Sequence, residues 1–207
     1  MQKTSTPEKR IFQHDIEVRA EGEKRRVIGY AALFNTRSVN FGDDDYPFFE
    51  VIAPGAFRNV LKDDVRALVD HKGGLNTLAR TKSGTLKLYE DDLGLRYEFE
   101  APDTQAGRDL VKILDRGDID QSSFGFQVNS DGQKFEEREE NGKQVLIRTI
   151  ETVSRLLDVS PVTYPAYPDT MAQARSFDEY RTKQNLSELA LETEARGRQI
   201  KLAELAN

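Results

Sequence analysis

The stretch QSSFGFQV at residues 121–128 alternates apolar with small or polar residues, as a β-strand does when its two faces have different surroundings. Phe124 and Phe126 fall on one face together with Ser122. Ser123 falls on the opposite face beside Gly125, which leaves space around it. Because the phenylalanines require burial, Ser123 is expected on a rigid backbone with an open approach. A serine nucleophile needs this setting, which an ordinary serine on a strand also shares.

Other segments show the same alternation, or short apolar runs, between turn signals. The expected strands cover residues 11–18, 27–34, 65–71, 85–90, 95–101, 119–128, 145–151 and 156–163. A short helix is expected from Pro54, and a longer one from Asp103 or Thr104 to Gly117. Residues 129–143 are expected to form a charged, turn-rich excursion. This pattern predicts a mostly-β domain with several helices, of the α+β class.

Histidine is scarce, because the chain contains only His14 and His71. His71 ends the strand expected over residues 65–71 and precedes Gly73 and Gly74. A side chain at such a strand end is held by the sheet and can still reach a substrate. His14 is expected in the middle of a strand among apolar residues, which favours a structural role. A lone histidine more commonly is exposed or simply hydrogen-bonded and has no catalytic role. Position alone therefore makes His71 a candidate base and no more.

Asp158 is a carboxylate inside the apolar strand expected over residues 156–163. A buried carboxylate is costly unless a neighbour compensates its charge. An imidazole is one such neighbour, and an arginine such as Arg80 or Arg155 is the alternative. The chain order of histidine, serine and carboxylate is no obstacle, because a catalytic triad is defined by its geometry.

The composition excludes several classes of protein. The 207 residues, 37% hydrophobic and 32% charged, suit one domain with an appendage. Without cysteine there are no disulfides, catalytic thiolates or cysteine-ligated zinc, and two distant histidines disfavour a metal site, so no cofactor is expected. A net charge of −6 disfavours nucleic acid. No apolar run has membrane-spanning length and the N-terminus lacks a signal-peptide core, so a soluble, non-exported protein is expected.

Changes in composition along the chain predict three parts. These are a disordered lead over residues 1–10, a folded domain over residues 11–175 and a helical tail over residues 176–207. Ser176 and Glu179 have the spacing of a capping box, and strong helix formers with a thin apolar stripe follow them. We expect this tail to lie outside the core and to serve recruitment or self-cleavage. The alternative is a helix that completes the folded domain.

Several short motifs recur in a fixed order along the folded domain. They are VDH at residues 69–71, LART at 78–81, SGTL at 83–86, GRDL at 107–110, RGDI at 116–119, SFGF at 123–126 and VSPVTYPAY at 159–167. In kind and spacing they closely resemble the prohead maturation proteases of tailed bacteriophages. The resemblance extends from about residue 29 to residue 175, and several independent motifs make it specific.

The resemblance implies a catalytic pair and a fold. In that family the histidine after the short strand and the serine of the SFGF motif act together, which here implies His71 and Ser123. This chain departs from the usual pattern at Gln121-Ser122, which adds Ser122 as a second candidate, although the strand phase favours Ser123. The family is distantly similar to the herpesvirus capsid proteases, which implies a β-barrel and a third catalytic residue. By that analogy the third residue is Asp158, with Glu151 as the alternative.

The resemblance also implies a substrate and a location. The expected activity is a serine endopeptidase that cleaves the scaffolding segment of the phage major capsid protein, and itself, inside the immature capsid in the bacterial host cytoplasm. The capsid protein and its scaffolding domain are then the partners, self-association is an option, and neither nucleic acid nor membrane is expected. One alternative is a catalytically inactive capsid-assembly or scaffold protein of the same fold. A carboxylate-only hydrolase is disfavoured, because the 36 acidic residues are scattered along the chain.

Overall fold

The computed structural model describes residues 6–13, 16–22, 24–163 and 182. The chain divides into two compact units, Met1–Asp169 and Thr170–Asn207, and all strands and helices below belong to the first. His14 and the tail expected over residues 176–207, except residue 182, lie outside the described residues. No helix in the described ranges is long and apolar enough to cross a membrane.

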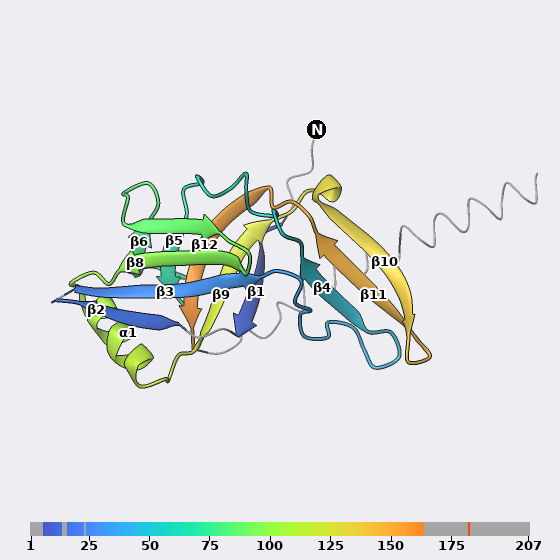
Figure 1. Ribbon diagram of the computed structural model, residues 1–207, viewed down its shortest axis with the longest axis horizontal. Coiled ribbons are helices and arrows are strands. Elements are labelled where there is room, and N and C mark those ends of the chain that lie inside the picture. Colours follow the sequence, from blue (N-terminus) through green and yellow to red (C-terminus); the bar gives the residue numbers. More distant parts are fainter. Residues whose placement is uncertain (1–5, 14–15, 23, 164–181, 183–207) are drawn as a thin grey trace, which may run out of the picture. The chain divides into compact units, whose positions relative to one another are not determined.

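The described strands form three sheets (Figure 1). The first has five strands, in the order β1 (Glu8–Gln13), β9 (Gln121–Gln127), β12 (Arg155–Val162), β5 (Arg66–Val69) and β6 (Lys72–Arg80). The second has four, in the order β2 (Glu17–Glu21), β3 (Lys24–Leu33), β8 (Gly94–Glu100) and β7 (Leu86–Glu90). The third has three, in the order β10 (Gln133–Glu140), β11 (Lys143–Ile150) and β4 (Phe48–Ile52).

The expectation of a mostly-β domain is confirmed, whereas several helices and a closed barrel are not found in the described residues. These residues contain one α-helix, α1 (Gln105–Asp115), and one short 3-10 helix, η1 (Ser130–Gly132). Helix α1 begins as expected, because the Thr104 side chain accepts a hydrogen bond from the Gly107 amide, and Gly117 follows it with a positive φ of 74°. Each sheet has two edge strands, so none of the three closes on itself.

The prediction of a helix from Pro54 is wrong, because residues 54–60 form consecutive turns. The apolar spacing that suggested a helix nevertheless describes the burial, since Phe57 and Val60 are both buried. The backbone bonds here join residues three apart, as from the Val60 amide to the Phe57 carbonyl at 3.0 Å. The Phe57 amide instead donates to the Glu90 carboxylate at 2.9 Å, so a side chain takes the place of a helical acceptor.

Strand boundaries differ from expectation in two other places. The segment expected as one strand over residues 11–18 is two strands in different sheets, β1 and β2, and β1 begins at Glu8, inside the expected lead. The excursion expected over residues 129–143 is largely strand β10, which pairs with β11 around Asn141-Gly142. Both turn residues have positive φ, 53° and 76°, and an Asn-Gly pair is the usual signal for such a hairpin turn.

Strand β12 lies at the centre of the five-stranded sheet and positions the residues of interest. On one side it pairs antiparallel with β9, where Ser160 is opposite Ser123. On the other side it pairs in parallel with β5, where Asp158 is opposite Arg66. Because β5 leads directly into the turn that contains His71, all three candidate residues lie on adjacent strands or at their ends.

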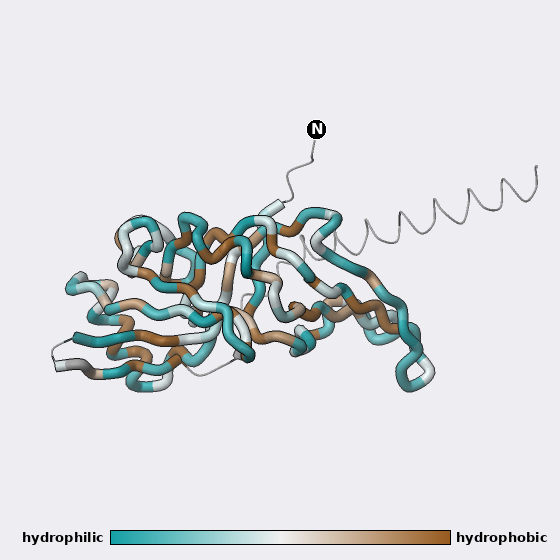
Figure 2. Tube along the Cα trace, turned by 45° about the horizontal axis from the view of Figure 1, so that its top comes forward, coloured by the Kyte–Doolittle hydropathy of each residue, from teal (hydrophilic) through white to brown (hydrophobic). Residues whose placement is uncertain are grey.

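The core is built on the face of β9 that contains its phenylalanines, as the alternation in residues 121–128 predicts. Phe124 and Phe126 are fully buried, and their stacked rings have centroids 4.6 Å apart. Phe57 packs against Phe124 edge-on, with 5.5 Å between the ring centroids. Figure 2 shows hydrophobic stretches alternating with hydrophilic ones along the chain. The packed aromatic rings thus fix the orientation of β9.

A buried cluster of four charges fastens β1 to the third sheet. Its members are Glu8 and Arg10 on β1, Glu50 on β4 and Arg148 on β11, and each is at most 7% exposed. Arg148 donates to Glu8 at 2.6 Å and to Glu50 at 2.5 Å, and Arg10 also hydrogen-bonds to both carboxylates. The Arg10 guanidinium lies 5.5 Å from the Phe126 ring centroid. The cluster has no net charge, as a buried ionic group requires.

The two arginines of this cluster change the pKa of Glu50. Burial alone raises its pKa, but the charges and hydrogen bonds of Arg10 and Arg148 outweigh burial and lower the pKa to about 2, from an ordinary value of 4.5. A carboxylate with a lowered folded-state pKa stabilises the fold above its unfolded pKa, and this stability is lost as the pH falls towards the folded pKa.

We expect Glu50→Gln to lower the free energy of unfolding by about 3–5 kcal/mol at pH 7, because it leaves the two arginines with one buried carboxylate. The substitution should also flatten the dependence of stability on pH between about 4.5 and 2. Urea unfolding at several pH values measures both effects. Glu140→Gln, which breaks the exposed pair with Arg37, is the matched control and should change little. Equal stability of the two variants would contradict the role of the cluster.

Candidate active site

The structure brings Ser123, His71 and Asp158 into one chain of hydrogen bonds. The Ser123 Oγ lies 2.6 Å from His71 Nε2, and His71 Nδ1 lies 2.5 Å from Asp158 Oδ1. An ionised carboxylate only accepts hydrogen bonds, so Nδ1 must hold the proton in this contact. Nε2 is then free to accept the Ser123 hydroxyl proton. This arrangement can deprotonate a serine as the serine attacks a carbonyl.

His71 is held by a two-residue turn rather than by the end of a strand. Asp70 and His71 both have left-handed backbones, with φ of 51° and 57°, and Val69 and Lys72 pair on either side of them. The turn therefore lies three residues before the expected position at Gly73-Gly74, and these glycines lie within β6 at a register shift. Residues other than glycine seldom adopt positive φ, and such positions concentrate at functional sites.

Asp158 is positioned by Ser160 and by the absence of a side chain at Gly125. The Ser160 hydroxyl donates to Asp158 Oδ1 at 2.7 Å, the same oxygen that contacts His71. A Cβ at Gly125 would lie 2.5 Å from the other carboxylate oxygen, Oδ2. The space beside Ser123 inferred from the sequence is therefore filled by the Asp158 carboxylate. Sequence reasoning did not identify Ser160, although its i+2 spacing from Asp158 places both side chains on one face of β12.

The site is almost entirely enclosed. Ser123 is 0% exposed, and the side chains of His71 and Asp158 are 6% and 13% exposed. Low exposure strengthens the electrostatic attraction between the ring and the carboxylate. It also means that a substrate carbonyl can reach the Ser123 Oγ only after a local rearrangement of the groups that cover it.

The other candidates from the sequence lie in different surroundings. Ser122 Oγ is 2.8 Å from the Tyr97 hydroxyl, and burial raises the pKa of Tyr97 well above its usual value, so this neighbour is a neutral phenol and no base. Glu151 is 46% exposed and pairs with Lys134. Arg80 binds Asp64 at 2.6 Å, so among the described residues the ionic partner of Asp158 is His71 and not Arg80.

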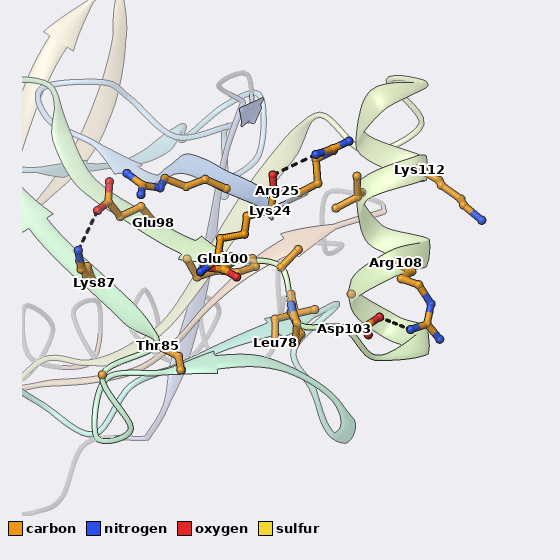
Figure 3. Close-up of a pocket in the computed structure, with 17 residues that line it drawn as sticks. Lys24, Arg25, Leu78, Thr85, Lys87, Glu98, Glu100, Asp103, Arg108 and Lys112 are labelled. Atoms are coloured by element: carbon orange, nitrogen blue, oxygen red, sulfur yellow. Dashed lines mark hydrogen bonds and ion pairs between the residues drawn. The ribbon is translucent and has the colours of Figure 1, made fainter. Parts of the chain in front are cut away.

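A separate pocket of about 810 Å³ lies between helix α1 and the ends of β3, β7 and β8 (Figure 3). None of the three site residues lines it. Several of its cations have acidic partners, as in the Lys24–Glu100 pair at 2.8 Å and the pair of Lys87 with Glu98 at 3.7 Å. Within the described residues, no group of three or more acidic, histidine or cysteine side chains is arranged to hold a metal ion.

We expect Gly125→Ala to disable Ser123, because the new methyl group would displace the Asp158 carboxylate, which two hydrogen bonds hold in place. The rate at which diisopropyl fluorophosphate labels Ser123 should fall about 10²-fold, as for a displacement of about 1 Å. Gly73→Ala is the matched control, since a Cβ there would meet no atom within 4 Å. Mass spectrometry of the labelled chain gives both rates, and equal rates would refute this account of Gly125.

Comparison with known proteins adds a family to this geometry. No curated protein matches the chain. The solved structure of the bacteriophage T4 capsid assembly protease gp21 is similar at 7% identity, covering 73% of this chain and 97% of that one, with a TM-score of 0.32. The family model of the caudovirus prohead serine protease matches residues 14–184. The chain therefore belongs to the caudovirus prohead serine protease family.

Proposed function

We propose that this protein is a serine endopeptidase that cleaves the scaffolding segment of a phage major capsid protein during capsid assembly. Ser123 is the nucleophile, His71 the general base and Asp158 the residue that orients the histidine. One observation carries the proposal, namely the distance of 2.6 Å between Ser123 Oγ and His71 Nε2. Family membership supplies the peptidase activity and the capsid context. The site of action is then the immature capsid in the host cytoplasm.

The proposed reaction proceeds in two steps. Ser123 Oγ bonds to the carbonyl carbon of the scissile peptide while its proton moves to His71 Nε2. The tetrahedral intermediate then collapses, the peptide C–N bond breaks, and the leaving amine takes the proton from Nε2. In the second step His71 Nε2 takes a proton from a water molecule, whose oxygen bonds to the acyl carbon. The ester C–O bond then breaks, and Ser123 Oγ takes the proton back from Nε2. Throughout, Asp158 accepts the Nδ1–H and stabilises the imidazolium cation.

The enclosure of the site bears on when this reaction takes place. A nucleophile with no exposed surface acts on a peptide only after the covering groups move, so the enclosed form is a resting state. A peptidase that acts on a capsid needs such a resting state, because cleavage before assembly would remove the scaffolding segment too early. Binding of a peptide substrate, either the capsid protein or the chain's own tail, is the step that we expect to open the site for cleavage, whereas a small reagent reaches Ser123 during brief local openings.

The test is co-expression with the capsid protein of the same phage, followed by its size. We expect Ser123→Ala and His71→Ala each to abolish processing, because loss of either residue removes most of the rate of a triad. Asp158→Asn should slow processing severely without always abolishing it. Ser122→Ala is the matched control and should still process, since its hydroxyl bonds to Tyr97. If Ser123→Ala still processes and Ser122→Ala does not, the assignment of the nucleophile is wrong.

A catalytically inactive assembly protein of the same fold remains the alternative function. The hydrogen-bonded Ser123–His71–Asp158 chain argues against it, because an inactive protein has no need of this geometry. If wild-type chain and Ser123→Ala support capsid assembly equally, with no processing in either case, the inactive function is correct.

We also propose that the protease cleaves itself somewhere beyond Arg175, within residues 176–207, the segment expected to be helical from its sequence. A charged helix with a thin apolar face can dock on a scaffold, and when it frays it becomes a protease substrate. Wild-type chain should therefore shorten during expression, whereas Ser123→Ala should keep its full mass of 23.5 kDa. Intact mass spectrometry of both proteins decides this. Identical full-length masses would contradict self-cleavage without affecting the assignment of the triad.

A further inference from the structure

The turn that presents His71 has a conformation that its second residue does not favour. In a two-residue hairpin turn with positive φ at both positions, glycine is the preferred second residue and asparagine or aspartate the preferred first. The turn here has Asp70 first and His71 second, with φ of 51° and 57°. Histidine at the second position is strained, so the surrounding structure must hold the turn in place.

Asp70 supplies the contacts that hold it. One carboxylate oxygen, Oδ1, accepts the Thr163 amide at 2.8 Å, and the other, Oδ2, accepts the Thr163 hydroxyl at 3.1 Å. The Asp70 amide donates to the Pro161 carbonyl at 3.0 Å. Lys72 lies 3.8 Å from Oδ2, and the Asp70 side chain is 29% exposed. Three hydrogen bonds thus tie the turn to the end of β12.

These contacts join the two halves of the site along a short path. Strand β12 contains Asp158 and Ser160. At its end, Pro161 accepts the hydrogen bond from the Asp70 amide, and Thr163, the next residue after the strand, donates two to the Asp70 carboxylate. The ring of His71 must meet Asp158 on one side and Ser123 on the other, at 2.5 Å and 2.6 Å. A turn free to relax would rotate the ring away from both partners, because the ring follows the backbone of residue 71.

We propose that Asp70 is a positioning residue for the reaction, acting through its two-oxygen contact with Thr163 to hold the His71 turn against β12. This inference rests on the proposed function of Ser123 and His71. Asp70 touches neither residue's reacting atoms, so its effect is on the geometry of the base. The amide of an asparagine can reproduce the contact, with its oxygen accepting the Thr163 amide and its N–H donating to the Thr163 hydroxyl. Geometry rather than charge is therefore what residue 70 must provide.

A second turn of the same type, at Asn141-Gly142, holds no residue of the candidate site. Asn141-Gly142 joins β10 to β11 with φ of 53° and 76°, and its flanking residues Glu140 and Lys143 pair as Val69 and Lys72 do. Asp70→Gly and Asn141→Gly each place glycine at the first position of such a turn, where positive φ suits it. Both variants should therefore fold, and only Asp70→Gly removes the contact with Thr163.

The experiment measures the reactivity of Ser123 in the full chain with diisopropyl fluorophosphate. In this reaction Ser123 Oγ displaces fluoride from phosphorus while His71 takes the hydroxyl proton. We expect Asp70→Gly to slow labelling about 10²-fold, Asp70→Asn to label nearly as fast as wild type, and Asn141→Gly to remain within about twofold of wild type. The low-field proton resonance of His71 Nδ1–H should shift or broaden in Asp70→Gly alone, with little change in melting temperature.

The outcomes separate this inference from the proposed function. Wild-type labelling rates in Asp70→Gly, or equal slowing in Asp70→Asn, would overturn the positioning role of the contact. If Asp70→Gly fails to fold, Thr163→Val decides, with slower labelling expected and an unchanged rate overturning the inference. If wild-type chain is not labelled at Ser123, or Ser123→Ala is labelled equally, the proposed function fails instead.

Discussion

The Asp158 carboxylate lies in the central strand of a five-stranded sheet, where an uncompensated charge would cost several kcal/mol. His71 Nδ1 and the Ser160 hydroxyl both bond to its Oδ1 atom and so compensate that cost. The same pairing that buries the carboxylate places Ser123 on the next strand and the His71 turn beyond the strand on the other side. The position of β12 between β9 and β5 is therefore the constraint on which the whole site depends.

A second set of buried charges is compensated by ion pairs between carboxylates and arginines. Glu50 and Arg148 also lie in otherwise apolar strands, and they are compensated by Glu8 and Arg10 of β1. Such clusters contribute little net stability compared with apolar residues, but they select one arrangement, because any other leaves a charge unpaired. Here the arrangement selected is β1 on the outer edge of β9, so the strand that contains Ser123 is paired on both sides.

The chain belongs to a family of prohead proteases, and its candidate site is enclosed. An enclosed site is compatible with a peptidase whose substrate must first open it. In the proposed reaction, full burial of Ser123 leaves the proposed nucleophile and base already aligned, with little further reorganisation needed once a substrate carbonyl is admitted. The strained turn at Asp70-His71 limits where the His71 ring can lie, and the close approach of the Asp158 carboxylate to Gly125 leaves no room for a larger residue at position 125. Under the proposed function, opening of the groups that cover Ser123, rather than assembly of the triad, is the step left for regulation.

The sequence by itself was enough to predict a mostly-β domain, the burial of Phe124 and Phe126, and the placement of Ser123 on the opposite face of its strand, because strand alternation is a local property. It also singled out Asp158, since a carboxylate in an apolar strand demands a partner. Which partner it has, His71 rather than Arg80, was decided by tertiary structure, because strand order and register bring together residues 87 positions apart. The open sheets, the turn at Asp70-His71 and the cluster around Arg148 likewise depend on long-range pairing that no local pattern encodes.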